Sequence, residues 1–330
     1  MSSTNSSTPD LTSLGVESEV ERYTLISWCL ITLLGSLVGN FIILLSTIRY
    51  NAIRLDKISV LLINNIAVSD IGSAVFGVHP VLVSLIWNKW SYGRIPCYVF
   101  HYLQVQFFFA AVLLICALHI SKLHLLIYPL HSMGRTRRCG YLISAAMWLL
   151  SAVLPLFQMA IDRHDVSFDY RVYRCKYSFR APVWQWLLAS LGLLLLVIPQ
   201  LIVVATTIAL LVIVKKAKGK KNKQGAITAM YVGCVYLLSN VPVGLFITIY
   251  TNISHLVSPD VRNFFDVTVC RISYFVLFLN CMSNGFVYYR SVNSFKIFVK
   301  RAALSFFNRV LFRQVVLPSA NFRMRVMNRI

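Results

Sequence analysis

The sequence predicts an all-α membrane protein, in which a seven-transmembrane helix bundle is followed by a short amphipathic eighth helix. Three observations lead to this fold class. Of the 330 residues, 58% are hydrophobic and only 13% are charged, whereas soluble domains contain about 45–50% apolar and about 25% charged residues. Seven stretches of the chain are long and almost free of charge. The charges between these stretches are distributed unequally between alternate loops.

Each of the seven stretches is long enough for a transmembrane helix, which needs about 20 apolar residues. The second stretch contains one charge, at Asp70, and the seventh is expected to begin near residue 264. None shows the alternating pattern of a transmembrane β-barrel. The stretches cover residues 23–48, 58–88, 95–121, 139–161, 181–214, 224–259 and 272–289.

The charge distribution predicts the orientation of the bundle. With the N-terminus outside, 22 of the 32 Lys and Arg residues lie on the inner side, and nine of the 11 acidic residues lie on the outer side. This arrangement follows the positive-inside rule, so we expect a multi-pass plasma-membrane protein with an extracellular N-terminus. The expected regions are an extracellular tail (1–22), the bundle (23–290), an amphipathic interfacial helix (291–305) and a basic cytoplasmic tail (306–330).

The net charge of +21 is typical of nucleic-acid binding in a soluble protein. Here the high apolar content argues against that reading, and the expected partner is the lipid bilayer rather than a nucleic acid. The aromatic content of 13% excludes disorder over most of the chain. The Asn-x-Ser triplets at Asn5 and Asn252 fall on the predicted outer side and are candidate glycosylation sites.

Two of the eight cysteines, Cys97 and Cys175, are expected on the outer, oxidising side. We therefore predict a disulfide between them, which would clamp the long loop after the fourth helix over the mouth of the bundle. No Cys or His cluster has the spacing of a zinc site. The sequence also contains no recognisable nucleophile or phosphate-binding loop, so it does not predict an enzyme.

Asp70 is the only acidic residue deep inside a predicted span. A buried carboxylate costs several kcal/mol unless it is neutralised, paired or hydrated. One interpretation is a protonated Asp70 that bonds to Asn40 or Ser69. The other is a functional ion site, which depends on the motifs described next.

Short motifs built from Gly, Asn, Trp, Pro and Tyr occur in most of the predicted helices. They are Gly39-Asn40, Asn65-Ile-Ala-Val-Ser-Asp70, Trp90-Ser-Tyr-Gly-x-x-x-Cys97, Tyr128-Pro129-Leu130, Trp148, Pro199, Pro242 and Asn284-Gly285-x-x-Tyr288 followed by Phe295.

From residue 23 to residue 302 these motifs resemble the rhodopsin-like (class A) G-protein-coupled receptors. The resemblance implies an extracellular ligand and a heterotrimeric G protein as partners, with an outward movement of the sixth helix on activation. It also implies a polar network that would hold Na⁺, although Ala111 and Cys281 replace serines that are frequent in the family. The network residues are Asn40, Asp70, Asn280 and Asn284.

Three landmarks depart from the family pattern. Ser121-Lys122-Leu123 replaces D-R-Y, so the planar five-donor guanidinium is lost. Asn240 replaces the Trp of C-W-x-P, and Gly285 replaces the Pro of N-P-x-x-Y. A raised resting activity and a weaker coupling both remain open. The implied coupling residues are Ser121, Lys122, Leu123, Pro129, Lys215 and Lys216, and the implied activation switch contains Pro199, Pro242 and Tyr288.

The predicted ligand pocket excludes two ligand classes. Gln104 stands where amine receptors of the family carry the Asp that pairs with the ligand ammonium. Phe278 stands where opsins carry the Lys that binds retinal. No retinal and no cofactor other than Na⁺ is therefore expected. Aromatic and amide side chains suit a small, mostly uncharged or peptide-like ligand. The predicted lining residues are Gln104, Phe108, Phe109, Trp186, Asn240, Phe246, Tyr274 and Phe278.

Two alternative functions remain at this point. A non-signalling seven-helix chaperone or scavenging receptor is favoured by Ser121-Lys122-Leu123. A transporter or channel is disfavoured because only Asp70 places a charge deep in the spans and no inverted repeat is visible. After the bundle, Phe295, Phe298 and Leu304 share a helix face beside Lys and Arg residues, which is typical of an interfacial helix.

Overall fold

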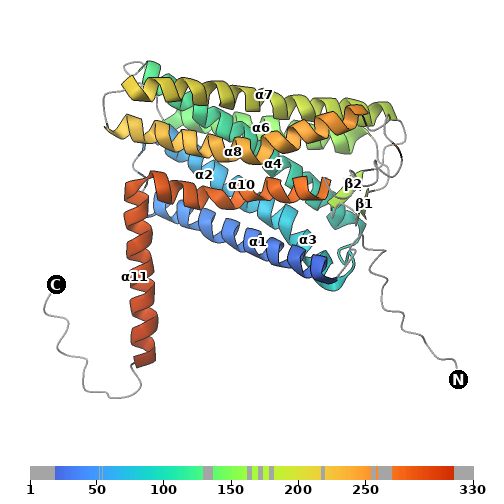
Figure 1. Cartoon of the computed structure of the whole chain (residues 1–330), viewed down its shortest axis with the longest axis horizontal. Helices are drawn as coiled ribbons and strands as arrows, with labels where there is room; N and C mark the ends of the chain where they lie inside the picture. Colours follow the sequence, from blue (N-terminus) through green and yellow to red (C-terminus); the bar gives the residue numbers. More distant parts are fainter. Residues whose placement is uncertain are drawn as a thin grey trace.

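The computed structural model describes residues 19–51, 53, 55–128, 137–161, 166–169, 174–177, 182–216, 220–253, 258 and 270–315. Long helices run side by side along the molecule, and α11 lies across them at one end (Figure 1). The large side chains on the outside of the bundle are apolar; Leu142, Leu238 and Phe286, for example, are more than 70% exposed. An apolar exterior is what a lipid bilayer requires of a spanning bundle.

The first two spans show how local sequence sets the helices. α1 (Glu19–Ile48) carries acidic residues in its first turn, where they interact favourably with the helix dipole. The second span consists of α2 (Lys57–Ser73), a π-helical turn η2 (Ala74–Val78) and α3 (His79–Trp87). Pro80 lies at the start of α3 and cannot donate to the preceding turn, which explains the wider turn before it.

The remaining spans are α4 (Arg94–Ile127), α6 (Arg137–Ile161), α7 (Pro182–Lys216), α8 (Lys220–Ile253) and α10 (Cys270–Ser291). α6, α7 and α8 each contain an internal proline, at Pro155, Pro199 and Pro242 respectively. Membrane helices tolerate such prolines because neighbouring groups satisfy the freed carbonyls.

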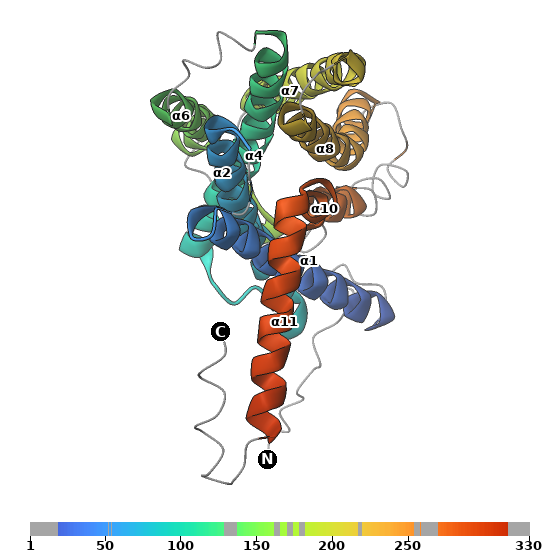
Figure 2. The same ribbon diagram turned by 90° about the vertical axis from the view of Figure 1, so that its left-hand side faces the viewer.

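The seven-helix bundle predicted from the sequence is confirmed. Within the described ranges, six helices are long and apolar enough to cross a membrane. The seventh, α10, has 22 residues and packs against both α1 and α8. α10 is more polar because it carries Asn280 and Asn284, both of which are buried. α4 lies in the interior and contacts α2, α6, α7 and α8, as the view along the helices shows (Figure 2).

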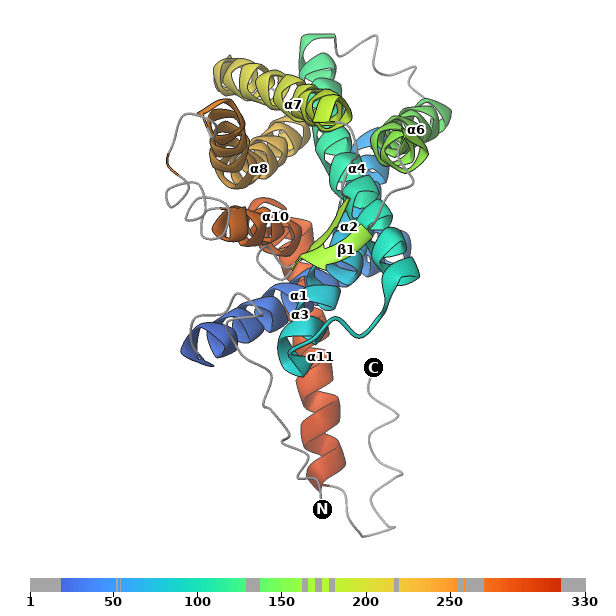
Figure 3. The ribbon, with the colours of Figure 1, turned by 90° about the vertical axis from the view of Figure 1, so that its right-hand side faces the viewer.

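The two ends of the bundle differ. At the end where α1 and α4 begin, β1 (Val166–Asp169) and β2 (Arg174–Tyr177) form an antiparallel hairpin in which Phe168 pairs with Cys175. This hairpin lies across the end of the bundle (Figure 3). We call it the hairpin end and the opposite one the α11 end.

α11 (Asn293–Val315) is longer than the amphipathic helix expected at residues 291–305. Residues 306–315 contain neither Gly nor Pro, so nothing in the local sequence ends the helix at residue 305. Leu304, Phe306 and Phe307 are all more than 60% exposed. The part of the expected cytoplasmic tail that follows Val315 lies outside the described residues.

Candidate functional site

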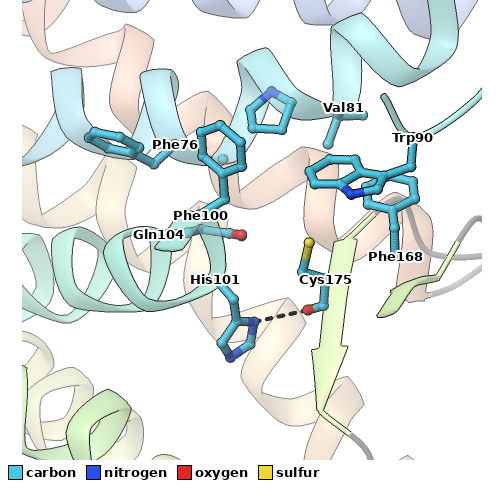
Figure 4. A pocket seen from close by; sticks show the side chains of 10 residues that line it. Phe76, Val81, Trp90, Phe100, His101, Gln104, Phe168 and Cys175 are labelled. Carbon is cyan, nitrogen blue, oxygen red and sulfur yellow. Dashed lines mark hydrogen bonds between the residues drawn. The ribbon is translucent and has the colours of Figure 1, made fainter. Parts of the chain in front are cut away.

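A pocket opens at the hairpin end, between the second span, α4 and the β-hairpin (Figure 4). It contains about 210 Å³ of empty space, counted out to the open solvent. Because this volume includes open solvent, the enclosed part of the pocket is much smaller, and it suits at most one group of a larger ligand. Its lining residues are Phe76, Gly77, Pro80, Val81, Trp90, Phe100, His101, Gln104, Phe168 and Cys175.

Stacked aromatic rings form one wall of this pocket. Trp90 stacks on Phe168 of the hairpin, with ring centroids 4.5 Å apart and an interplanar angle of 11°. The Trp90 indole also donates a hydrogen bond of 2.7 Å to the Gly93 carbonyl, which fixes the loop before α4. Phe100 meets the Trp90 ring edge-on at 6.0 Å. These contacts hold the wall in place without a ligand.

The predicted disulfide between Cys97 and Cys175 is present, with the two Cα atoms 5.5 Å apart. It ties β2 to the beginning of α4. His101, one turn further along α4, donates from Nδ1 to the Cys175 carbonyl over 2.9 Å, while its Nε2 lies 3.4 Å from Gln158 Oε1 of α6. The hairpin is therefore attached to α4 twice, by the disulfide and by the hydrogen bond from His101, and covers one side of the pocket.

The predicted ligand residues do not all gather in this pocket. Gln104 lines it, and Phe278 lies directly beneath the lining residue Gly77, where an added Cβ would come within 2.7 Å of the Phe278 ring. Phe109 instead packs between α4, α6 and α7 with Leu154 and Phe108. Asn240 is buried in α8. The side chains of Trp186, Phe246 and Tyr274 lie outside the described part of the structure.

Sequence reasoning did not select the aromatic lining residues of the second span and the hairpin. Phe76 belongs to the π-helical turn, and Phe168 belongs to a hairpin that the disulfide ties to α4. The sequence did contain a signal for this aromatic wall. Trp90 and Cys97 belong to one loop motif that resembles the receptor family, which places Trp90 near the disulfide.

A polar network joins α1, α2 and α10 around Asp70, which is fully buried. The Asn284 amide donates to Asp70 Oδ2. The Asn40 amide donates to the Cys281 carbonyl over 2.8 Å, and the Ser36 hydroxyl donates to the Asp70 backbone carbonyl over 3.3 Å. The structure therefore brings together Asn40, Asp70 and Asn284. The fourth predicted member, Asn280, is buried one turn before Asn284 on α10.

The donor set around Asp70 fits a small cation. Asp70 Oδ1, Asn40 Oδ1 and Ser73 Oγ are buried and make no hydrogen bond to the described residues. Oxygen ligands with one negative charge suit a hard cation such as Na⁺. Within the described ranges, no group of three or more His, Cys, Asp or Glu side chains could hold a transition metal.

Trp148 of α6 connects to the same motif of α2. Its indole nitrogen donates to Asn65 Oδ1 over 2.9 Å, and its ring meets the Phe107 ring of α4 edge-on at 5.6 Å. Trp148 thus links three helices through one hydrogen bond and one ring contact.

At the α11 end, Lys122 forms an ion pair with Asp56. Asp56 also caps α2, because its Oδ2 accepts a hydrogen bond of 3.0 Å from the Ser59 amide. Burial raises the pKa of the Asp56 carboxyl, but the Lys122 charge and the hydrogen bonds from Lys122 and Ser59 lower it more, so the pKa lies below its ordinary value. The Lys122 side chain is only 3% exposed.

The other predicted coupling residues are placed less closely together. Ser121 is buried, Leu123 packs on the cluster formed by α7 and α8, and Lys215 is exposed. Pro129 and the Lys216 side chain lie outside the described residues. Of the predicted switch residues, Pro199 and Pro242 lie inside α7 and α8, and Tyr288 is 1% exposed in the central core.

The two predicted glycosylation sites have no described side chain. Asn5 lies outside the described residues, and Asn252 lies in the last turn of α8 without a described side chain.

Several known proteins are similar to this chain. It is 27% identical over 156 residues to "Neuropeptide Y receptor type 5" of Sus scrofa, covering 46% of this chain and 34% of the relative. It is 28% identical over 138 residues to "C-X-C chemokine receptor type 2" of Mus musculus, covering 42% and 37% respectively. It is 32% identical over 101 residues to "Vasopressin V1b receptor" of Mus musculus, covering 31% and 24%. The matched part thus spans about a third of the length of the first two relatives.

The sequence model of one family covers most of the bundle. This family is described as "7 transmembrane receptor (rhodopsin family)", and the match extends over residues 39–288. It includes the Asp70 network, the disulfide and the aromatic pocket. The chain belongs to the rhodopsin family of seven-transmembrane receptors.

Proposed function

We propose that this protein is a G-protein-coupled receptor for an extracellular peptide, which binds at the hairpin end and activates a heterotrimeric G protein at the α11 end. The observation that carries the proposal is the preformed aromatic pocket under the disulfide-bonded hairpin, in a chain of the rhodopsin receptor family. The relative named for neuropeptide Y supports a peptide as the ligand class.

The pocket chemistry also supports a peptide. Phe76, Trp90 and Phe100 offer ring faces and edges to an apolar or aromatic side chain, while Gln104 offers an amide that can pair with a peptide group. The enclosed space is small, so at most one side chain of a peptide would enter it and the rest of the peptide would lie over the hairpin. The absence of a carboxylate among the lining residues disfavours an amine ligand.

The proposed orientation places the hairpin end outside the cell and the α11 end in the cytoplasm. The positive-inside distribution of Lys and Arg supports this orientation. So does the disulfide at the hairpin end, since disulfides persist in oxidising compartments. The protein would therefore be a multi-pass plasma-membrane protein with an extracellular N-terminus, and Asn5 would be open to glycosylation.

Signalling would begin when a ligand in the pocket favours one arrangement of the helices over another. The pocket is formed by the second span and α4, and α4 runs from there to Lys122 at the α11 end. A shift of α8 away from α4 would open a cleft for the G protein. Lys122, Leu123 and Lys215 would then contact it, and Na⁺ held by Asp70, Asn280 and Asn284 would favour the resting arrangement.

The direct test is ligand-stimulated nucleotide exchange. The purified receptor in lipid nanodiscs is mixed with a G-protein panel and screened against an amidated and free-acid peptide library. We expect at least one peptide to accelerate exchange. Gln104→Leu and Phe100→Leu should weaken its potency by about five- to thirtyfold, since each removes a contact worth about 1–2 kcal/mol in the pocket.

Phe109→Leu is the matched control. Phe109 lies on the same helix as Phe100 but packs away from the pocket. The potency of the peptide at the Phe109→Leu receptor should therefore equal its potency at the wild type. Peptide binding without exchange would instead favour the non-signalling chaperone or scavenging receptor. Equal potency losses at Phe100 and Phe109 would reject the pocket as the ligand site.

A further inference from the structure

Two glycines of α8 mark the places where this helix contacts α4 most closely. A Cβ at position 233 would collide with the His119 ring, and a Cβ at position 225 would lie 2.9 Å from Lys122 Nζ. The two glycines are about two helical turns apart, and His119 and Lys122 are about one turn apart on α4. Both contacts are therefore on the α11 half of the interface between α4 and α8.

The His119 ring occupies the space left by the missing Cβ of Gly233, which we call the Gly233 notch. The ring cannot easily move out of this space. Its Nδ1 lies 3.3 Å from Thr206 Oγ1 of α7, and the side chain is completely buried. A side chain enclosed in this way by α7 and α8 sets the distance between α4 and α8. Because the notch exists only if residue 233 lacks a Cβ, the contact depends on glycine at that position.

The second notch is at Gly225 of α8, and the Lys122 ammonium lies against it. This ammonium pairs with Asp56 at the start of α2. The negative partner therefore comes from α2, and α8 contributes a lid rather than a charge. An ammonium that loses its carboxylate while it remains covered is strongly unfavourable, so the pair and the lid stabilise each other.

We propose that these two contacts form a latch that keeps α8 against α4 in the resting receptor. The latch consists of His119 in the Gly233 notch and of the Lys122–Asp56 ion pair beneath Gly225. It takes the place of the ionic restraint that Ser121-Lys122-Leu123 lacks, and His119 and Gly233 act as positioning residues. This inference rests on the proposed function only for its link to signalling.

The latch predicts that crowding either notch, or removing the Asp56 charge, opens the interface between α4 and α8. Gly225→Ala and Gly233→Ala push α8 outward by crowding the notches. Asp56→Asn keeps the helix cap, since Asn caps as well as Asp, but removes the carboxylate charge beside the Lys122 ammonium and so favours opening to water. Lys122→Met removes the charge that needs the carboxylate, so the double variant Asp56→Asn/Lys122→Met closes again.

Hydrogen exchange of the amides of residues 220–233, measured by mass spectrometry in nanodiscs, tests the latch without a G protein. Gly225→Ala, Gly233→Ala and Asp56→Asn should each accelerate this exchange by about tenfold, equivalent to about 1.4 kcal/mol. Basal nucleotide exchange should rise in the same three variants. The Asp56→Asn/Lys122→Met variant should return to the wild-type rate of hydrogen exchange.

Gly192→Ala on α7 is the matched control, because its Cβ would meet only a Leu154 methyl at an ordinary 3.6 Å. Faster hydrogen exchange in the three latch variants, with Gly192→Ala unchanged, supports the latch even if no G protein responds. The missing G-protein response would count against the proposed function alone. Wild-type hydrogen exchange in Gly233→Ala and Asp56→Asn overturns the latch even if the receptor signals. Failure of Lys122→Met to reverse Asp56→Asn also overturns it.

Discussion

Two groups of helices in this bundle pack in different ways. α1, α2 and α10 are joined by hydrogen bonds between helices, from Asn40 to Cys281, from Asn284 to Asp70 and from Ser36 to Asp70. Gly39 and Gly285 also bring the backbones of α1 and α10 into close contact, since a Cβ at position 285 would lie 3.0 Å from the Gly39 Cα.

The interface of α4 with α7 and α8 is polar as well. His119 Nδ1 lies 3.3 Å from Thr206 Oγ1 across α4 and α7, while other polar groups bond within their own helices. Asn240 donates to Tyr236 and Ser239 of the same helix, and Thr206 donates to Ile202 and Val203. Among the described residues, several buried atoms here make no hydrogen bond to protein. They include Thr207 Oγ1 and Asn240 Oδ1.

This difference distinguishes a rigid group of helices, α1, α2 and α10, which we call the frame, from the movable helix α8. Helices that exchange hydrogen bonds in a low-dielectric interior lose them when they separate, so α1, α2 and α10 stay together. α8 contacts α4 through the two glycine notches and donates one hydrogen bond of 3.3 Å to α10, from the Gln224 amide to the Ser291 carbonyl. Packing contacts such as the notches can be exchanged for another arrangement at lower cost than a network of hydrogen bonds. The same substitution should therefore have different effects in the two groups.

The largest expected effect comes from glycine substitution in the frame. An added Cβ at Gly72 of α2 would collide with the Phe107 ring of α4, and α2 cannot retreat because Asp70 ties it to α10. Gly72→Ala should therefore lower the free energy of unfolding by about 3 kcal/mol, at the upper end for overpacking, without raising basal nucleotide exchange. Thermal unfolding and basal exchange measure the two effects. If Gly72→Ala activated the receptor as strongly as Gly233→Ala, the frame would be no more rigid than α8.

A smaller effect is expected from two buried asparagines. Asn40→Leu removes the hydrogen bond to Cys281 that joins α1 to α10 and should cost about 1–1.5 kcal/mol of unfolding free energy. Asn240→Leu removes an amide whose Oδ1 has no described partner and should be neutral or stabilising, because the buried polar atom is removed together with its bonds inside the helix. Thermal unfolding of the two variants in one detergent provides the comparison, and equal losses would contradict it.

The smallest effect concerns Na⁺ in the frame. If Asp70 holds Na⁺, a concentration tenfold above its dissociation constant should stabilise the fold by about 1.4 kcal/mol. The unfolding temperature should therefore rise in NaCl relative to choline chloride at equal ionic strength. Asp70→Asn should abolish the difference, since it removes the charge and keeps a side chain of similar shape. An equal salt response in both proteins would exclude Asp70 as the cation site.

Features that depend on composition or on single helices followed from the sequence. The apolar runs predicted the spans because the bilayer accepts only helices of that length and character. Asp70 and Asn284 were predicted to be neighbours because their motifs resemble the family, and the structure joins them by a hydrogen bond. The Cys97–Cys175 bridge followed from which loops share one side of the membrane.

Features that depend on helix rotation, or on partners far apart in the chain, could not be predicted from the sequence. Phe76 reaches the pocket through the π-helical turn at residues 74–78, which changes the faces that α2 and α3 present. Phe108 and Phe109 were expected in the pocket, but the rotation of α4 turns Phe109 towards α6 and α7.

The sequence by itself determined the class of protein, the number and positions of the helices and the central place of Asp70, because these depend on apolar length and local motifs. Only the tertiary structure decided what replaces the missing D-R-Y restraint. Lys122 and Asp56 are 66 residues apart in the chain, and Gly225 and Gly233 become notches only when α8 lies against α4. A contact between helices is set by their packing, which no local pattern encodes.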